Sequence, residues 1–421
     1  MRSKKPFPAG KPIFVIFITL LLVSSIVPTH AQAQKFKVLH TFHGKDGAYP
    51  TGGLIRDSDG NFYGITNEGG TSKGCPHGCG TAFEFASSGK ETVLYSFTGK
   101  NGDGEYPASW VSPVRDAAGN VYGTTSSGGD LTECGDGCGV VFELNKEDKE
   151  TILHIFGKGT DGAEPTSGLI RDAHGNLYGT TEIGGANNGG TLFRITKGGA
   201  YSILHSFDFP GMGTDGADPV GPMTQDLSGN LYGTTVAGGE NDCGTIFKLD
   251  THKKETVFFS FPCGPGGDGP YGQLLVDSAG NIYGTTKVGG NSGCFDGGGC
   301  GVVFKVDSSG TESVLYTFSG GSDGGYPFAG LVKDAAGDLY GTTINGGDAG
   351  VGVVFELEAS GNETVLHSFT GGSDGSFPGD LFMNSTGNLY GLASGGGNAK
   401  CQDGCGTLFR IILGIKPSSS Q

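Results

Sequence analysis

Apolar and polar residues alternate in short runs along most of the chain, and glycine, proline, asparagine or aspartate separates the runs. Val, Ile, Thr, Tyr and Phe predominate in the runs, as is typical of β-strands, and the separating residues favour tight turns. Outside the first 33 residues, no segment has the 3.6-residue period of an amphipathic helix. The pattern therefore predicts an all-β protein.

The strand pattern recurs seven times. Each copy has the tripeptide Tyr-Gly-Thr or a close variant, and the tyrosines are Tyr63, Tyr122, Tyr178, Tyr232, Tyr283, Tyr340 and Tyr390. Each copy begins with a connecting segment that contains Asp-Gly, which we call the crossing. An apolar run ending in aspartate and a tight turn come next, before the tripeptide. Gly-Gly, a variable loop and two more strands follow it. Each copy is therefore expected to form four strands of five to seven residues.

Tandem four-stranded units of this length are typical of a β-propeller. The last copy ends after the strand 407–411 and lacks its fourth strand, whereas 36–42 at the other end of the chain matches the fourth strands 92–97 and 364–369. A strand from the start of the chain that completes the last sheet would close a ring and remove its exposed edges. We expect a single seven-bladed β-propeller of four-stranded blades, closed in this way.

The N-terminus has the order of a secretory signal. Arg2, Lys4 and Lys5 precede an apolar run at 13–27, and Ala31-Gln32-Ala33 offers a small-x-small cleavage site. The run is shorter than the ~20 residues of a membrane span, although an uncleaved anchor is the alternative. We expect a signal peptide at 1–33, the propeller at 34–413, a disordered tail at 414–421, and a secreted or periplasmic protein.

Acidic residues outnumber basic ones by 43 to 27, and the formal net charge is −16. Removing the basic signal segment makes the mature chain more acidic still. Phosphate backbones and anionic membrane surfaces repel such a protein. We therefore expect no nucleic-acid partner, no membrane span after signal cleavage, and a monomer.

The ten cysteines suit an oxidising compartment. Zinc is the alternative to disulfides, but the close pairs fall on separate blades, whereas a zinc site needs four ligands together. We expect the disulfides Cys75–Cys79, Cys134–Cys138, Cys243–Cys263, Cys294–Cys300 and Cys401–Cys405.

The repeated unit, DSxGNLYGTTxxGG…GTVFEL…ETVLHSF, resembles the GloVer (Gloeo/Verruco) tandem repeat of bacterial choice-of-anchor surface proteins, from Phe36 to Ile411. It is more distantly similar to the regulator-type propeller repeats of sensor ectodomains, which share a GNLWxGT core. The resemblance implies an exported propeller of the bacterial cell envelope. It implies no reaction, because it provides no catalytic residues to transfer.

Aspartates recur at fixed places in the unit. Because they recur, we expect them to stabilise turns through backbone N–H groups, with calcium binding or catalysis as the alternatives. The crossing aspartates are Asp46, Asp103, Asp161, Asp215, Asp268, Asp323 and Asp374, and those that end the apolar runs are Asp57, Asp116, Asp172, Asp226, Asp277 and Asp334. We expect no cofactor and no metal ligand, apart from a structural calcium ion as a possibility.

Histidine offers little sign of catalysis. His40, His154, His205 and His367 share one fourth-strand position with Tyr95, Phe259 and Tyr316, so we expect them to pack. In a four-stranded blade the second-to-third loops and the crossings share one face, which we call the loop face. His43 and His77 lie there, and they do not make a Ser-His-Asp triad.

Long loops on a rigid scaffold are the usual place for a binding site, so we expect it on the loop face. Residues that differ between the copies are the candidates. We expect ligand contacts from Tyr49, Tyr106, Trp110, Tyr326 and Phe377, with the acids Glu164 and Asp218 opposite. Aromatic rings and carboxylates suit glycans or cationic peptides, and the alternative is that the rings fill gaps between blades.

Three functions fit these residues. A module that binds glycans or peptides comes first, because no nucleophile, metal cluster or cofactor motif is recognisable. A carbohydrate-active enzyme, either a glycoside hydrolase or a polysaccharide lyase, is the second, with Glu164 and Asp218 as its weak catalytic candidates. A sensor-type module for protein–protein contact is the third.

Overall fold

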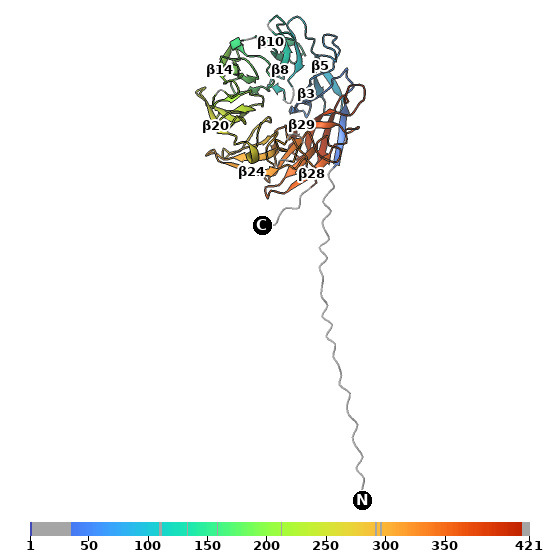
Figure 1. The fold of residues 1–421 in the computed structure, drawn as a ribbon. Helices are drawn as coiled ribbons and strands as arrows, with labels where there is room; N and C mark the ends of the chain where they lie inside the picture. Colours follow the sequence, from blue (N-terminus) through green and yellow to red (C-terminus); the bar gives the residue numbers. More distant parts are fainter. Residues whose placement is uncertain are drawn as a thin grey trace. The chain divides into compact units, whose positions relative to one another are not determined.

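The computed structural model describes Met1 and residues 35–108, 112–132, 134–157, 159–211, 213–290, 293–294 and 297–414. Trp110, the signal segment 2–33 and most of the expected tail lie outside these residues. The chain from Gln34 to Leu413 forms one compact unit, in which the sheets of seven blades surround a central axis (Figure 1). In the described parts of the chain, no helix has the length and hydropathy needed to cross a membrane.

The first three blades follow the chain order of the repeat, and all neighbouring strands are antiparallel. Blade 1 contains β2 (Ile55–Arg56), β3 (Phe62–Thr66), β4 (Thr81–Phe85) and β5 (Glu91–Ser96); blade 2 contains β6 (Gly104–Pro107), β7 (Val114–Arg115), β8 (Val121–Gly128), β9 (Val140–Leu144) and β10 (Glu150–Ile155); blade 3 contains β11 (Ile170–Arg171), β12 (Leu177–Thr181), β13 (Thr191–Ile195) and β14 (Tyr201–Ser206).

The next three blades repeat this arrangement, and a two-stranded ribbon of β15 (Gly216–Ala217) and β18 (Ala237–Gly238) accompanies blade 4. Blade 4 contains β16 (Thr224–Gln225), β17 (Leu231–Thr235), β19 (Thr245–Leu249) and β20 (Glu255–Ser260); blade 5 contains β21 (Leu275–Val276), β22 (Ile282–Thr286), β23 (Val302–Val306) and β24 (Glu312–Thr317); blade 6 contains β25 (Val332–Lys333), β26 (Leu339–Thr343), β27 (Val353–Leu357) and β28 (Glu363–Ser368). The short 3-10 turns η1 (Gly159–Asp161) and η2 (Gly264–Gly266) lie in crossings.

The N-terminal strand closes the ring, as expected. Blade 7 contains β29 (Ser376–Met383), β30 (Leu389–Gly395) and β31 (Thr407–Ile412), and β1 (Lys35–Thr41) is its fourth strand. Val38 pairs with Phe409, and Thr41 pairs with Thr407. Between Val38 and His40 the register shifts, so Leu39 is a bulge residue without a partner opposite it. The fourth strands of the other six blades have a bulge at the same place.

The first strands correct one expectation, because most of them have two residues rather than five to seven. In blade 1, for example, Pro50, Gly52 and Gly53 precede β2. Proline has no N–H to donate and glycine offers no side chain to pack, so this stretch is not part of the strand, which begins only at Ile55.

Aromatic pairs join each blade to the next. The phenylalanine that follows each fourth strand is fully buried and packs against the third-strand phenylalanine of the neighbouring blade. The pairs are Phe42–Phe83, Phe97–Phe142, Phe156–Phe193, Phe207–Phe247, Phe261–Phe304, Phe318–Phe355 and Phe369–Phe409, with ring centroids 5.0–5.3 Å apart. Seven hydrophobic clusters therefore lie between blades and continue around the ring.

The glycine of the Tyr-Gly tripeptide makes room for this phenylalanine. A Cβ placed on Gly64 would lie 2.5 Å from the Cζ atom of Phe83, which is closer than two carbon atoms can approach. The same contact recurs in the other blades, for example 2.6 Å between Gly341 and Phe355. The tripeptide is therefore repeated for a packing reason.

Apart from Asp268, the recurrent aspartates accept backbone N–H groups, as expected. Asp57 accepts backbone N–H groups from Asp59 and Asn61 and the hydroxyl of Tyr63, which ties the first turn to the second strand. The crossing aspartate Asp103 accepts the N–H and hydroxyl of Thr98 and the hydroxyl of Tyr95.

All five expected disulfides are present: Cys75–Cys79, Cys134–Cys138, Cys243–Cys263, Cys294–Cys300 and Cys401–Cys405. Cys243–Cys263 joins the residues that flank the outer hairpin of blade 4, and the other four lie within second-to-third loops.

Candidate functional site

The residue directly before each crossing proline lies on the loop face and has left-handed backbone geometry. In six blades this residue is not glycine, and its φ lies between 52° and 56°. In blade 5 it is Gly269, with φ 64°. The six are Tyr49, Tyr106, Glu164, Asp218, Tyr326 and Phe377.

The backbone of this residue joins two blades. The Tyr49 N–H donates to the carbonyl of Cys405 in blade 7 (3.3 Å), and its carbonyl accepts the N–H of Asn67 in blade 1 (3.0 Å). Left-handed geometry is unfavourable for bulky residues, and Gly269 shows that the crossing can be built without a side chain. The backbone is therefore the common element, while the side chain can differ from blade to blade.

The structure brings four of the predicted aromatic residues to this one ring, but their exposure differs. Tyr49, Tyr106 and Phe377 are half-buried. Tyr326 is only 7% exposed, so its ring packs mostly in the interior and offers a ligand less surface than those three. Trp110 is outside the described residues.

The predicted acids are more accessible, since Glu164 is exposed and Asp218 is half-buried. Burial, together with the charge of Asp242, raises the pKa of Asp218. Sequence reasoning missed a third acid, Glu182, directly after β12. Burial raises the pKa of Glu182, and the nearby charges of Glu164 and Asp218 raise it further.

An aromatic pair with a lysine lies next to these acids. Tyr271, after the crossing proline of blade 5, stacks on Phe328 of blade 6 with centroids 4.3 Å apart and ring planes 25° apart. The Nζ atom of Lys287 lies 5.3 Å from the Tyr271 centroid and 5.9 Å from that of Phe328. Phe328 and Lys287 were not among the predicted residues. Their signal was available, because both stand at repeat positions that change from blade to blade.

The acids act electrostatically on this aromatic pair. Burial raises the pKa of Tyr271, and the charges of Glu182, Asp218 and Asp268 raise it further. We call Glu182, Asp218, Tyr271, Lys287 and Phe328 the mouth cluster. It combines aromatic faces, carboxylate acceptors and an ammonium donor.

One cavity is lined by a residue of this ring, and a second lies on the axis. A pocket of about 700 Å³ lies where blades 7 and 1 meet, and Tyr49, Glu68, His77 and Asp403 line it. Burial and the charges of Asp403 and Glu68 raise the pKa of Tyr49. The Tyr49 hydroxyl donates to the backbone carbonyl of Gln402, so this side chain has a structural partner.

The second cavity, of about 460 Å³, is lined by first-strand residues of all seven blades around the axis. Its acid is Asp380, which accepts the N–H of Gly330 at 2.7 Å. Burial raises the pKa of Asp380 to about 6. Its wall combines apolar side chains, mostly Leu, Ile and Val, with the polar residues Ser112, Arg115, Arg171 and Gln273.

Comparison with known proteins agrees with the fold. The repeat family described as "Gloeobacter/Verrucomicrobia repeat" matches residues 24–213, 112–334 and 295–416. No curated protein matches the sequence. Streptogramin B lyase is structurally similar with a TM-score of 0.57 and 13% identity, over 91% of this chain and 99% of the lyase.

Two extracellular domains from B. thetaiotaomicron are also similar. One belongs to a hybrid two component system (TM-score 0.55, 12% identity) and the other to a one component system (TM-score 0.54, 10% identity). The matches cover 89% and 90% of this chain and 40% of each of those chains. At these identities the likeness concerns the fold alone.

Proposed function

The chain belongs to the Gloeobacter/Verrucomicrobia repeat family, and we propose that it is an exported β-propeller that binds a glycan on its loop face. The observation that supports this function is the mouth cluster, where the stacked rings of Tyr271 and Phe328 lie beside Glu182 and Asp218. Ring faces stack on the apolar faces of sugars, and carboxylates accept hydroxyl groups.

Glycan binding would place the mouth cluster at one side of a larger site. The half-buried rings of Tyr49, Tyr106 and Phe377 and the exposed carboxylate of Glu164 share the loop face with it. Trp110 belongs to the same proposal, on the sequence alone. Since scaffold roles repeat in every blade, side chains that differ between blades suit a ligand that binds in one orientation.

Export is part of the proposal. Five disulfides fit an oxidising compartment, and two of the similar structures are extracellular domains. Cell fractionation with N-terminal sequencing of the protein tests this, with mature protein beginning after Ala33 as the expected result. Recovery of the whole chain from the cytoplasm would contradict it.

A glycan array with the purified protein tests the ligand. Tyr271→Ala should weaken binding several-fold, because stacking on such a ring contributes about 1 kcal/mol, and Trp110→Ala should do the same. Leu227→Ala is the matched control, because Leu227 is 88% exposed in a turn on the opposite face. If no glycan binds and cationic peptides do, the glycan assignment fails.

A carbohydrate-active enzyme is the second candidate, favoured by the raised pKa of Asp218 and Glu182. A raised carboxyl pKa is a property that a general acid needs, and Glu164 is another candidate carboxylate. Asp218→Asn, Glu182→Gln and Glu164→Gln distinguish the two functions. They would abolish turnover in an enzyme and only reduce affinity in a binder.

A further inference from the structure

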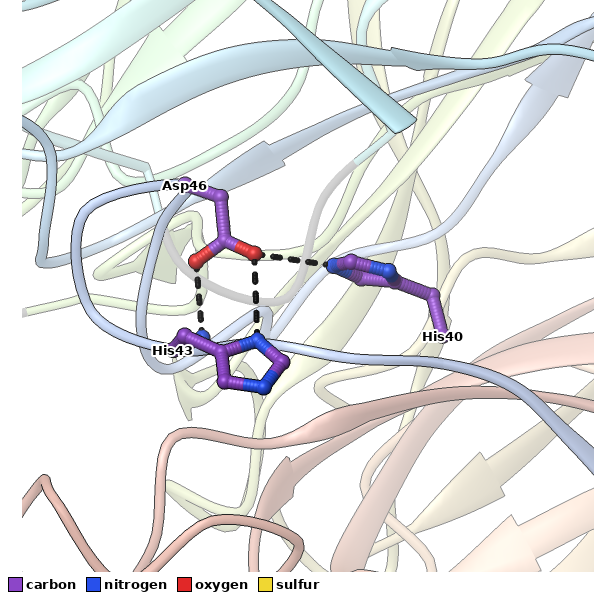
Figure 2. Close-up of side chains that lie close together, drawn as sticks. All are labelled: His40, His43 and Asp46. Carbon is purple, nitrogen blue, oxygen red and sulfur yellow. Dashed lines mark hydrogen bonds and ion pairs between the residues drawn. The ribbon is translucent and has the colours of Figure 1, made fainter. Parts of the chain in front are cut away.

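Two imidazoles and a carboxylate meet where the N-terminal strand ends (Figure 2). The Oδ2 atom of Asp46 lies 3.0 Å from Nε2 of His40 and 3.5 Å from Nδ1 of His43. One ligand atom from each of the three residues lies within 4.8 Å of the others. We propose that His40, His43 and Asp46 form a binding site for a divalent first-row transition metal, with Zn²⁺ as the best fit.

The contact between one histidine and the crossing aspartate belongs to the repeat and is no sign of a metal. His154–Asp161, His205–Asp215 and His367–Asp374 have the same contact, at 3.2, 2.8 and 3.1 Å. Two other clusters of possible ligands can be set aside in the described parts of the chain. Cys75 and Cys79 are joined in a disulfide, and the group of His205, Asp215 and Glu255 has one imidazole and uses the repeat contact.

The second imidazole is what distinguishes this crossing. The residue in the place of His43 is Thr98, Ser319 or Thr370 in three other blades, and each donates its backbone N–H to the crossing aspartate. His43 makes the same backbone bond, at 2.7 Å to Oδ1 of Asp46. The scaffold therefore needs only the N–H group here, and the imidazole is additional.

The ligand atoms have suitable spacing for zinc. Zn–N and Zn–O bonds are ~2.0–2.2 Å long, so adjacent ligand atoms of a tetrahedral site are roughly 3.3 Å apart. The two distances to Oδ2 of Asp46, 3.0 and 3.5 Å, lie on either side of that value. A small rotation of His43 would suffice, and its side chain is 53% exposed.

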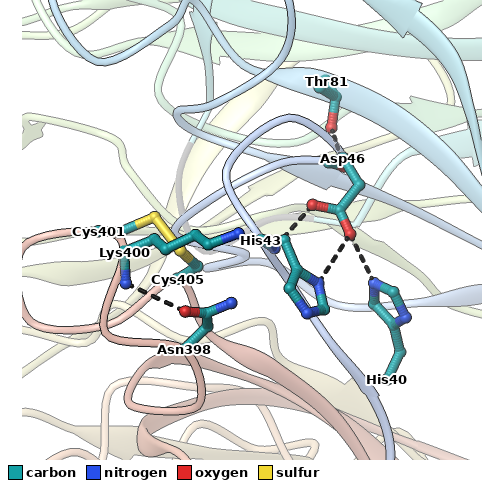
Figure 3. A network of polar contacts seen from close by, with 8 residues as sticks. All are labelled: His40, His43, Asp46, Thr81, Asn398, Lys400, Cys401 and Cys405. Atoms are coloured by element: carbon teal, nitrogen blue, oxygen red, sulfur yellow. Dashed lines mark hydrogen bonds and ion pairs between the residues drawn. A yellow bond between two sulfur atoms is a disulfide. The ribbon is translucent and has the colours of Figure 1, made fainter.

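The surroundings hold the carboxylate in place. Oδ1 of Asp46 accepts the His43 N–H, which leaves Oδ2 for the metal, and the Asp46 carbonyl accepts the hydroxyl of Thr81 at 3.2 Å. Such hydrogen bonds to a ligand orient it and add to affinity. Figure 3 shows Lys400 and the Cys401–Cys405 disulfide beside His43. Three protein ligands leave the fourth position of a tetrahedral ion to water.

Calorimetric titration with Zn²⁺, using the full protein after treatment with a chelator, tests the site. The wild type should bind one ion, and His43→Ala should weaken binding by about tenfold or more. His77→Ala is the matched control, because His77 is another exposed loop-face imidazole, and it should bind as the wild type does. Asp46→Asn, which keeps the shape of the side chain and removes its charge, should also weaken binding.

The metal-free melting temperature separates this role from a structural one. In the presence of chelator, His43→Ala should have the same melting temperature as the wild type, because the scaffold uses only the backbone of His43. Zn²⁺ should raise the melting temperature of the wild type but not that of His43→Ala. Equal Zn²⁺ affinity of the wild type and His43→Ala would overturn the proposal. So would the absence of binding of Zn²⁺, Co²⁺ and Ni²⁺ at micromolar concentrations.

Discussion

Phe42 packs edge to face against Phe83, with ring centroids 5.2 Å apart and ring planes 69° apart. Phe42 directly follows the strand that completes blade 7, whereas Phe83 belongs to the third strand of blade 1. The N–H of Phe42 also donates to the carbonyl of Gly406, at 3.1 Å. One residue near the start of the described chain therefore joins the last blade to the first.

Phe42→Ala should destabilise the whole propeller. The ring is fully buried, and truncating a buried phenylalanine typically costs about 3–5 kcal/mol. Chemical denaturation monitored by fluorescence measures the loss. Phe209→Ala is the control, because Phe209 is 50% exposed, and it should change stability by less than ~0.5 kcal/mol. A Phe42→Ala variant as stable as the control would show that this contact does not close the ring.

The tripeptide glycine gives a second stability prediction. Gly341→Ala should destabilise the protein by about 1–3 kcal/mol, because its Cβ would lie 2.6 Å from the Cζ atom of Phe355. Gly361→Ala is a useful comparison, because nothing lies within 4 Å of the Cβ there, although its φ of 91° adds strain. Combining Gly341→Ala with Phe355→Leu should recover part of the loss if the clash is its cause.

The disulfides should contribute unequally. Cys243–Cys263 closes a loop with a sequence separation of 20, and Cys75–Cys79 closes one of 4. Chain entropy then gives about 3 kcal/mol for the first and about 2 kcal/mol for the second. Paired serine variants, Cys243→Ser with Cys263→Ser and Cys75→Ser with Cys79→Ser, measure the difference by thermal melting. The reverse order of stability would rule out chain entropy as the main cause.

Seven-fold recurrence made the fold predictable from the sequence. Strand order, ring closure and the cysteine pairs depend on features repeated or paired along the chain, such as the fourth strand 36–42 and the cysteines 243 and 263. The length of the first strands was less predictable, because it depends on how proline and glycine behave next to the axis.

The candidate site was harder to predict, because its residues meet across blades. Lys287, Tyr271 and Phe328 come from blades 5 and 6, and their contacts depend on the angle between the sheets. The metal candidate was missed for a different reason. His40 looked like a packing residue because it matches Tyr95 and Phe259, and only the structure places His43 within reach of the same carboxylate oxygen.

Half-buried glutamates at the start of the fourth strands should make the fold more stable at acidic pH. Burial raises the pKa of five of them: Glu91, Glu255, Glu312 and Glu363 to about 7, and Glu150 to about 8. A carboxyl whose pKa is higher in the folded state stabilises the fold when it is protonated. That contribution is complete below the unfolded pKa of about 4.3 and is lost as pH rises through 7 to 8.

The turn aspartates should lower the stability of the fold again at strongly acidic pH. Burial opposes their ionisation, but the hydrogen bonds that they accept lower the pKa of Asp57 and Asp116 below the ordinary value. Their contribution is present above the unfolded pKa and is lost as pH falls below it. The melting temperature should therefore be highest near pH 5 and should fall towards pH 8, which a series of thermal melts would measure.

A substitution of Glu312 tests whether these glutamates cause the fall in melting temperature towards pH 8. Burial alone raises the pKa of Glu312, and its Oε1 atom has no hydrogen-bond partner. The preceding blade has Phe259 at the fourth-strand position that is His or Tyr in most blades, so the polar ring found there in other blades is absent. Glu312→Gln removes the charge, so it should raise the melting temperature at pH 8, leave it nearly unchanged at pH 5 and flatten the profile. Glu240→Gln, at an exposed position, should follow the wild type at both values. If Glu312→Gln instead lowers stability equally at both pH values, the carboxylate is a favourable partner in the fold, and burial of its charge does not explain the pH dependence.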